Sequence, residues 1–240
     1  MNLPAPSADS LALLCLPHAG ARASAYRDWA DELPSTLQAL PLDYPRRADA
    51  TQAPDSVATL ADRLQSALAS WPAAHPVALF GHSLGALVAY ELALRLARER
   101  RPPLLLVVSG HRAPQEPARE APVHGLPSPA LRSWATQRGG VPRALRDDAA
   151  VFELFEPALR EDLRLAETWQ PPAPQALPCP IVALSGLNDA LAPPDSMASW
   201  REHTRTTFRQ HALPGGHFFL LEQRPQFLAL LALEIERCHA

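Results

Sequence analysis

The sequence lacks lysine altogether, so all 22 of its basic side chains other than histidine are arginines. A catalytic lysine, and with it Schiff-base chemistry on a lysine amine, is therefore excluded. Cysteine is scarce as well, and Cys15, Cys179 and Cys238 form neither a C-x-x-C pair nor a zinc-like spacing. A sparse, odd set is typical of a reducing compartment, and Cys15, within an apolar run, is expected to be a buried small hydrophobe.

Long hydrophobic runs and an excess of charge of one sign are also missing. The chain of 240 residues has a net charge of -3, with neither a basic patch suited to nucleic acid nor an acidic tail. The apolar run Leu11–Leu16 is far shorter than a signal peptide or a membrane span. We therefore expect a cytoplasmic protein that binds neither nucleic acid nor membrane. No dimer seam is evident in the sequence, so we expect a monomer.

Short apolar strands alternate with amphipathic helices along most of the chain, which predicts an α/β fold with a mostly parallel, doubly wound sheet. The length and the 47% hydrophobic content fit a single domain over residues 1–240. The predicted strands are Leu11–Leu16, Leu37–Leu42, Val77–Phe80, Leu104–Val108, Ile181–Leu184 and Thr206–Leu213. The predicted helices are Ser24–Leu33, Asp55 or Ser56 to Leu68, Leu84–Arg98, Asp195 or Ser196 to His203, and Pro225–Arg237.

The alternation stops between residues 112 and 178. This stretch has no convincing strand and is too long for an ordinary loop, yet too apolar for a disordered segment. Its predicted helical segments are Ser128–Gln137, Asp147–Phe155 and Pro157–Thr168. We expect a helical lid inserted over the carboxyl edge of the sheet; a helical subdomain with no gating role is the alternative.

The stretch Gly81-His82-Ser83-Leu84-Gly85 joins a predicted buried strand directly to a predicted helix. In that context G-x-S-x-G is typical of the nucleophile elbow, the sharp turn that exposes the catalytic serine of α/β-hydrolases. The glycines leave room where the strand and the helix close on each other. A glycine-rich turn with a capping serine is the alternative, and the flanking strand and helix disfavour it.

Two other strand ends carry groups that would complete a catalytic triad with Ser83. Asp189 comes after the strand Ile181–Leu184, and His217 follows the last strand within a glycine turn. The carboxyl ends of parallel strands meet at one edge of the sheet, and Ser…Asp…His is the chain order of these hydrolases. We expect His217 to take the Ser83 proton and Asp189 to orient the imidazole. Asp195, after two prolines, is instead expected to cap a helix.

None of the other histidines has the position of His217. His211 lies within a predicted strand, His203 ends a helix, and the side chain of His82 is expected to point away from its neighbour Ser83. Packed or solvated positions are expected for His75, His111, His124 and His239.

We expect Ser83 to attack an acyl carbonyl. The negative charge that then develops on the carbonyl oxygen, the oxyanion, needs hydrogen-bond donors. The backbone N–H of Leu84, at the start of the elbow helix, is one candidate. The loop after the first strand should supply the other, and Ala19 is the residue we choose there. His18 could assist the oxyanion or only orient this loop.

From about Leu13 onward the chain resembles the type II thioesterases, the stand-alone hydrolases that accompany nonribosomal peptide and polyketide synthases. The resemblance rests on LLCLPHAG at 13–20, YRDWADELP at 26–34, FGHSLGA at 80–86, SGHRAP at 109–114, GGVPRALRDD at 139–148, ALREDLRLAETW at 158–169, ALSGLNDALAP at 183–193 and LPGGHFFLLE at 213–222. It implies Ser83, Asp189 and His217 as the triad, with Ala19 and Leu84 forming the oxyanion hole.

The resemblance also implies the reaction, which is release of acyl or aminoacyl groups from the phosphopantetheine arm of carrier proteins, clearing stalled or misprimed synthases. No metal or organic cofactor is implied, and the substrate arrives on a partner protein. Alternatives are a medium-chain acyl-carrier thioesterase that releases a product, a small-molecule carboxylesterase, and an acyltransferase. A lipase is disfavoured by the absence of a secretion signal. A catalytically silent, carrier-binding scaffold is disfavoured by the intact triad.

Two positions depart from the family pattern. Ala21 replaces a usual glycine after the PHAG loop, and Arg46 replaces the glycine of a usual Tyr-Pro-Gly-Arg stretch. Arg46 is expected to reshape the mouth of the site or to face an acidic carrier protein. Reverting it with Arg46→Gly should then weaken turnover of a carrier-bound substrate and spare a small thioester. Equal effects on the two substrates, measured by steady-state kinetics, would refute this hypothesis.

Overall fold

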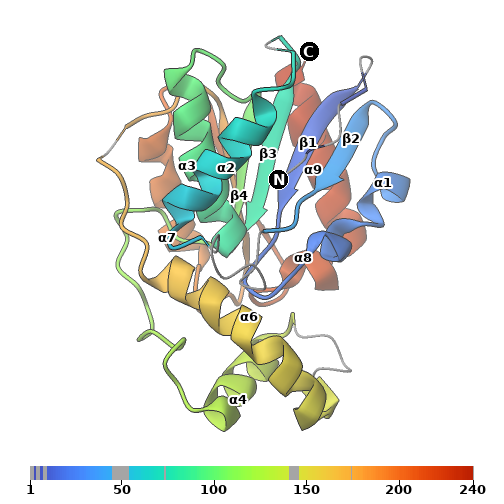
Figure 1. The fold of residues 1–240 in the computed structure, drawn as a ribbon. Helices are drawn as coiled ribbons and strands as arrows, with labels where there is room; N and C mark the ends of the chain where they lie inside the picture. The colour runs from blue at the N-terminus through green and yellow to red at the C-terminus, as the bar shows by residue number, and fades with distance from the viewer. Residues whose placement is uncertain are drawn as a thin grey trace.

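The computed structural model describes residues 3, 6–7, 10–44, 54–72, 74–140, 146–173 and 175–239. Its central feature is a six-stranded sheet with the strand order β2-β1-β3-β4-β5-β6, in which every pairing is parallel (Figure 1). The strands are β1 (Leu11–Leu16), β2 (Leu37–Pro41), β3 (Val77–His82), β4 (Leu105–Ser109), β5 (Ile181–Gly186) and β6 (Phe208–Leu213). The predicted parallel α/β sheet is confirmed.

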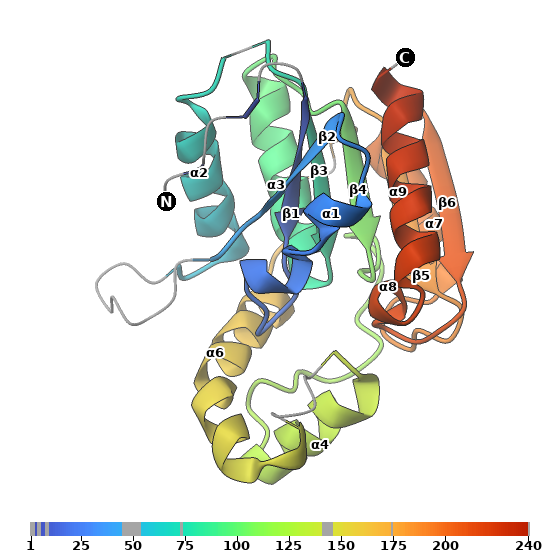
Figure 2. The same ribbon diagram turned by 90° about the vertical axis from the view of Figure 1, so that its right-hand side faces the viewer.

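Helices cover both faces of this sheet, as the turned view in Figure 2 shows. One face packs against α2 (Val57–Leu68), α3 (Leu84–Arg98), α7 (Pro194–Ala198) and the 3₁₀ helix η2 (Ser199–His203). The other packs against η1 (Ala23–Tyr26), α1 (Trp29–Glu32), α8 (Phe219–Glu222) and α9 (Arg224–His239). An inner strand that is covered on both faces is apolar throughout, which explains the uninterrupted run in β1, whereas the edge strand β6 (FRQHAL) is only half-buried and carries polar residues.

Two of the predicted helices are wrong in their extent. The Ser24–Leu33 stretch forms the separate short helices η1 and α1, because Tyr26 and Trp29 both turn their rings into the core against Phe80. The second predicted helix, at Asp195 or Ser196 to His203, divides into α7 and η2. Asp195 is not the cap that we expected: Pro193 holds that position, and the Asp195 carboxylate accepts the Ser196 N–H and pairs with Arg119.

Residues 112–178, called the helical segment from here on, contain α4 (Ser128–Arg138) and α6 (Ala149–Glu167). Figures 1 and 2 place both helices beyond the carboxyl ends of the strands. The predicted break at Pro157 is wrong, since α6 runs through it. The proline ring lies on the exposed side of the helix, while Phe152, Leu159 and Leu163, before and after it, pack into one small core. Burial of that face outweighs the loss of one backbone hydrogen bond.

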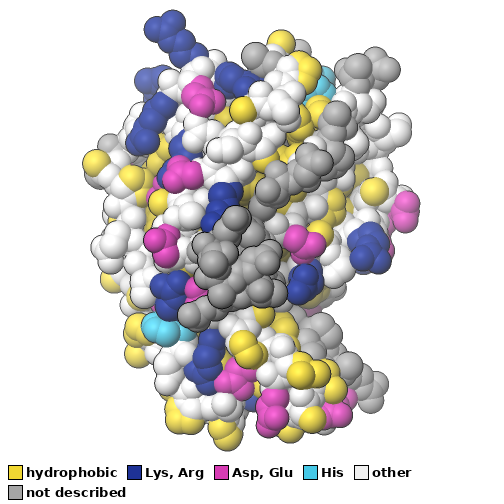
Figure 3. Space-filling view, viewed as in Figure 1, with side chains coloured by type: hydrophobic (Ala, Val, Ile, Leu, Met, Phe, Trp, Pro, Cys, Tyr) yellow, Lys and Arg dark blue, Asp and Glu magenta, His cyan; other side chains and the backbone are white. Residues whose placement is uncertain are grey.

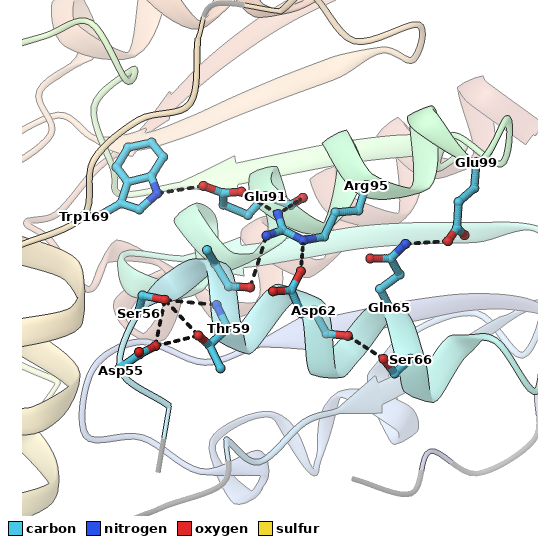
Figure 4. Close-up of polar contacts among 11 residues, drawn as sticks. Asp55, Ser56, Thr59, Asp62, Gln65, Ser66, Glu91, Arg95, Glu99 and Trp169 are labelled. Atoms are coloured by element: carbon cyan, nitrogen blue, oxygen red, sulfur yellow. Dashed lines mark hydrogen bonds and ion pairs between the residues drawn. The ribbon is translucent and has the colours of Figure 1, made fainter. Parts of the chain in front are cut away.

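A polar network fastens the end of α6 to the body of the protein (Figure 4). The indole N–H of Trp169, two residues after α6, donates to Glu91 Oε1 of α3 at 3.0 Å. Glu91 is buried and pairs with Arg95, whose Nε donates to Asp62 Oδ1 of α2 at 2.6 Å. The guanidinium also donates to the Ala58 carbonyl. One carboxylate therefore joins α2, α3 and the helical segment.

The face drawn in Figure 3 carries side chains of both charges. In the space-filling view of Figure 3, arginine side chains and acidic side chains are interspersed over this face instead of gathering by sign. None of the helices in the described ranges combines the length and the apolar character that crossing a membrane requires.

We predict that Glu91→Ala lowers the free energy of unfolding by about 2 kcal/mol, because it leaves the Arg95 guanidinium and the Trp169 indole without their buried acceptor. Glu99→Ala is the matched control, since Glu99 bonds Gln65 between the same two helices but at the surface. Its effect should stay within about 0.5 kcal/mol. Urea unfolding measures the free energy of unfolding of both variants. Equal losses would contradict the stabilising role assigned to the buried Glu91 network.

Candidate active site

The elbow residue Ser83 lies in a strained turn between β3 and α3. Its backbone has φ 54° and ψ -116°, a region that residues other than glycine rarely adopt. A Cβ at Gly81 would lie 2.0 Å from the carbonyl oxygen of Gly85, and a Cβ at Gly85 would lie 2.1 Å from that of Leu16. Both positions therefore require glycine, and the G-x-S-x-G motif has a steric cause here.

Neighbouring strands hold this turn in place. The Ser83 N–H donates to the Ser109 carbonyl, the last residue of β4, at 2.8 Å. His82 is fully buried, and its Nδ1 lies 3.0 Å from Ser109 Oγ. His82 thus packs and hydrogen-bonds against the end of β4.

The predicted acid and base lie within hydrogen-bonding distance of each other. His217 Nδ1 lies 2.9 Å from Asp189 Oδ2, and both side chains are buried. The other carboxylate oxygen of Asp189 accepts the N–H groups of Leu191 at 2.9 Å and Ala192 at 3.2 Å. Burial alone raises the pKa of Asp189, but the hydrogen bond and charge of His217 and the two N–H groups outweigh it and hold the pKa below its ordinary value. Asp189 is thus an anion that fixes the imidazole, with Nε2 left for a proton from elsewhere.

Ser83 and His217 line the same cavity, whose volume is about 590 Å³. No hydrogen bond joins the Ser83 hydroxyl to the imidazole in the described part of the chain. The sheet edge forms one wall of the cavity, and Phe155, Leu159 and Leu163 of α6 line another. The arrangement gives the Ser83 hydroxyl and the His217 imidazole access to the same apolar chamber.

The two residues predicted to stabilise an oxyanion stand on either side of this turn. Ala19 lines the cavity in the loop after β1, and the pairing of Leu16 with Gly81 places that loop beside the elbow. Leu84 is the first residue of α3, where backbone N–H groups have no acceptor within the helix. Its side chain is buried. The assignment of the two N–H groups stays a prediction.

Three more histidines surround His217, and His111 among them was not expected at the site. It lines the cavity two residues after β4, and its position just beyond a strand end was the signal available in the sequence. Burial, and then the charge of Arg112, lowers the pKa of His111 to about 3. Burial, and then the charge of His217, lowers the pKa of His18 to about 3 and that of His82 well below its usual value. All three are therefore neutral near pH 7.

The other histidines lie away from Ser83, and in the described part of the chain all but one of them pack against or bond to neighbouring side chains. His203 bonds Tyr90 and Gln115, His211 bonds Glu234, His124 bonds Glu167, His75 packs on Trp71, and His239 is exposed. Ala21 lines the cavity, and its N–H donates to the His18 carbonyl. Arg46 lies outside the described residues. Within those residues no group of three or more His, Cys, Asp or Glu side chains is arranged to hold a metal ion.

Comparison with known proteins gives this site a context. The family model for the thioesterase domain matches residues 12–232. Thioesterase PikA5 of Streptomyces venezuelae is 39% identical over 224 residues, which cover 92% of this chain and 79% of PikA5. The structure of RedJ, a thioesterase from the prodiginine biosynthetic pathway in Streptomyces coelicolor, is 37% identical and superposes with a TM-score of 0.84, covering 98% of this chain and 96% of RedJ. BorB, a type II thioesterase from the borrelidin biosynthetic cluster, is 33% identical with a TM-score of 0.85 over the same shares.

The low pKa of His18 predicts how stability depends on pH. The unfolded chain takes up a proton on this histidine below about pH 6.5, whereas the folded chain does so only near pH 3, so acid favours unfolding. Between pH 7 and pH 5, His18→Gln should therefore lose about 2 kcal/mol less unfolding free energy than the native protein does. Urea unfolding at the two pH values measures this, with the exposed His239→Gln as the control for losing a histidine. The same pH dependence in the native protein and in His18→Gln would contradict it.

Proposed function

Because this chain belongs to the thioesterase family, and is thus a serine hydrolase that acts on thioesters, we propose that it removes acyl and aminoacyl groups from the phosphopantetheine arm of carrier proteins. Its role would be to clear misprimed or stalled nonribosomal peptide or polyketide synthases. The relatives named for prodiginine and borrelidin biosynthesis support this assignment. The one observation that carries it is the buried His217–Asp189 pair. The imidazole of this pair and Ser83 line a cavity large enough for an acyl group.

The proposed reaction begins at Ser83. His217 Nε2 takes the hydroxyl proton while the oxygen attacks the thioester carbonyl, and Asp189 stabilises the imidazolium that forms. The tetrahedral intermediate collapses with loss of the thiolate, which receives the proton from His217. Water then attacks the acyl carbonyl while His217 takes one of its protons. The second tetrahedral intermediate collapses, His217 returns that proton to the Ser83 oxygen, and the acyl group leaves as a carboxylic acid.

The N–H groups of Ala19 and Leu84 are the proposed donors to the oxyanion of both intermediates. Preorganised donors of this kind are worth several kcal/mol of the barrier, about 3 kcal/mol for each one removed. The placement of Leu84 at the start of a 15-residue helix supports this role, since the positive end of the helix dipole faces a developing negative charge.

The leaving group explains why such an enzyme tolerates many acyl groups. A thiol has a pKa of about 8.5, so its anion leaves far more readily than an alkoxide does. The site then needs little protonation of the leaving group and little contact with the acyl chain. Phosphopantetheine arrives on the carrier protein, and every step is assigned to side chains and backbone of this chain.

The helical segment is the proposed lid. Its helices α4 and α6 lie beyond the sheet edge, and its apolar side chains line the same cavity as Ser83. A wall of that kind suits a substrate delivered on a long flexible arm, because the chamber opens and closes around an acyl group. The free, mostly buried cysteines fit the proposed cytoplasmic location.

The proposal predicts broad release activity that depends on Ser83. In a panel of acetyl-, aminoacyl- and octanoyl-carrier proteins, the native protein should release the short acyl groups and the aminoacyl groups at comparable rates. Ser83→Ala should lower release by about 10⁴-fold or more and abolish labelling by a fluorophosphonate.

Each other outcome selects an alternative. Fast octanoyl release beside negligible acetyl release would replace editing with programmed chain release. Hydrolysis of p-nitrophenyl esters without any carrier-bound activity would indicate a carboxylesterase, and transfer to an added acceptor would indicate an acyltransferase. A native protein that neither turns over nor takes up the fluorophosphonate would be a binding scaffold.

A further inference from the structure

One face of α6 presses on the loop that contains Ala19. Phe155, Leu159 and Asp162 are spaced by four and then three residues, which places them on the same side of a helix. All three contact or bond Gly20, more than 130 residues earlier in the chain. Asp162 is only 4% exposed, and its Oδ2 accepts the Gly20 N–H at 2.7 Å.

Gly20 itself is shaped for this contact. Its φ of +80° favours glycine, and a Cβ there would lie 2.5 Å from Phe155 Cζ and 3.2 Å from Leu159 Cδ1. The backbone of the loop therefore approaches α6 more closely than any side chain would permit. Gly20 has only a hydrogen atom where any other residue would place a Cβ against the helix.

Ala19 and Gly20 are the two central residues of a tight turn. The Ala21 N–H donates to the His18 carbonyl at 3.0 Å, which closes the turn, and a φ near +80° at its third residue is the value of a type II turn. Types I and II differ in the orientation of the central peptide, here the one between Ala19 and Gly20. Because N–H and C=O point in opposite directions in a trans peptide, anchoring the Gly20 N–H to α6 turns the Ala19 carbonyl away from it.

We propose that Asp162 is a positioning residue: by holding the Ala19–Gly20 peptide against α6 it fixes the turn, and with it the preceding His18–Ala19 peptide, whose N–H receives the oxyanion. The inference rests on the proposed function of Ala19. A charged acceptor makes this hydrogen bond about twice as strong as one between neutral groups, and burial keeps water from replacing it. The oxyanion hole is then complete only while α6 is docked on the loop.

A second contact couples the helical segment to the other half of the site. A Cβ at Gly140, just after α4, would lie 2.2 Å from the ring of Phe218, the neighbour of His217. The helical segment thus touches both the loop of the proposed oxyanion donor and the loop of the base. The reactive geometry is therefore complete only when this segment is docked on both loops.

The test replaces Asp162 with residues of nearly its own shape. Asp162→Leu keeps the branched outline without an acceptor, and Asp162→Asn keeps an acceptor without the charge. Glu156→Gln is the matched control, because Glu156 is also a buried residue of α6, and its bonds among the described residues are to Ser128 and Arg160, within the helical segment. A small acyl thioester serves as substrate, so that the test does not depend on carrier recognition.

The expected order of kcat is native, then Asp162→Asn, then Asp162→Leu, with losses of about 3- to 10-fold and about 10- to 100-fold. KM should change by less than about 2-fold, and affinity for a trifluoromethyl ketone analogue, which forms an oxyanion on the serine, should fall in proportion to kcat/KM. Glu156→Gln should leave kcat and this affinity within about 2-fold of native.

Three results would overturn the proposal. One is a folded Asp162→Leu with native kcat. Another is a loss confined to KM, which would make the contact a substrate-binding feature only. The third is a loss of kcat without loss of affinity for the ketone. If Asp162→Leu does not fold, Asp162→Asn decides on the same two measurements. Failure on carrier proteins together with these effects on the small thioester would refute the proposed substrate and leave the role of Asp162 standing.

Discussion

The close backbone approach at Gly81, Ser83 and Gly85 is the constraint from which the rest of the site follows. A non-glycine residue at positive φ costs on the order of 1–3 kcal/mol, and it persists only where its surroundings enforce it. Here the enforcement comes from burial: 12 of the 15 residues of α3 are buried, and the turn is hydrogen-bonded to the end of β4. The central position of β3 then places Ser83 between the loops that follow β1 and β4.

The helical segment depends on that same rigid edge. Its far end is fastened to α3 through Trp169 and Glu91, and its middle rests on the Ala19–Gly20 turn through Asp162. On either side of the Asp162 attachment, Phe155, Leu159 and Leu163 of α6 form the apolar wall of the cavity. The molecule therefore has a stiff half, which holds Ser83, His217 and Asp189, and a half, the helical segment, that closes the cavity over them. Because the low pKa values of the three histidines around His217 leave them neutral near pH 7, they add no positive charge beside its imidazole.

The sheet, and the meeting of Ser83, Asp189 and His217 at its carboxyl edge, could be predicted because each depends on local pattern. Buried parallel strands are apolar throughout, and their carboxyl ends meet at one edge, so residues after strand ends converge. The errors arose where tertiary contacts override local preference. α6 runs through Pro157 because its apolar face is buried, and Tyr26 and Trp29 break a predicted helix to fill the core. The bond from Asp162 to Gly20 spans 142 residues, and no spacing in the sequence indicates it.

Capture of the acyl-enzyme tests the central claim most directly. The native protein, mixed with an acetyl-carrier protein and quenched within one turnover, should gain the mass of one acetyl group. Proteolytic mapping should place that group on the peptide containing Ser83, and Ser83→Ala should gain nothing. An acetyl group on another residue, or release of acetate at full rate by Ser83→Ala, would contradict the account.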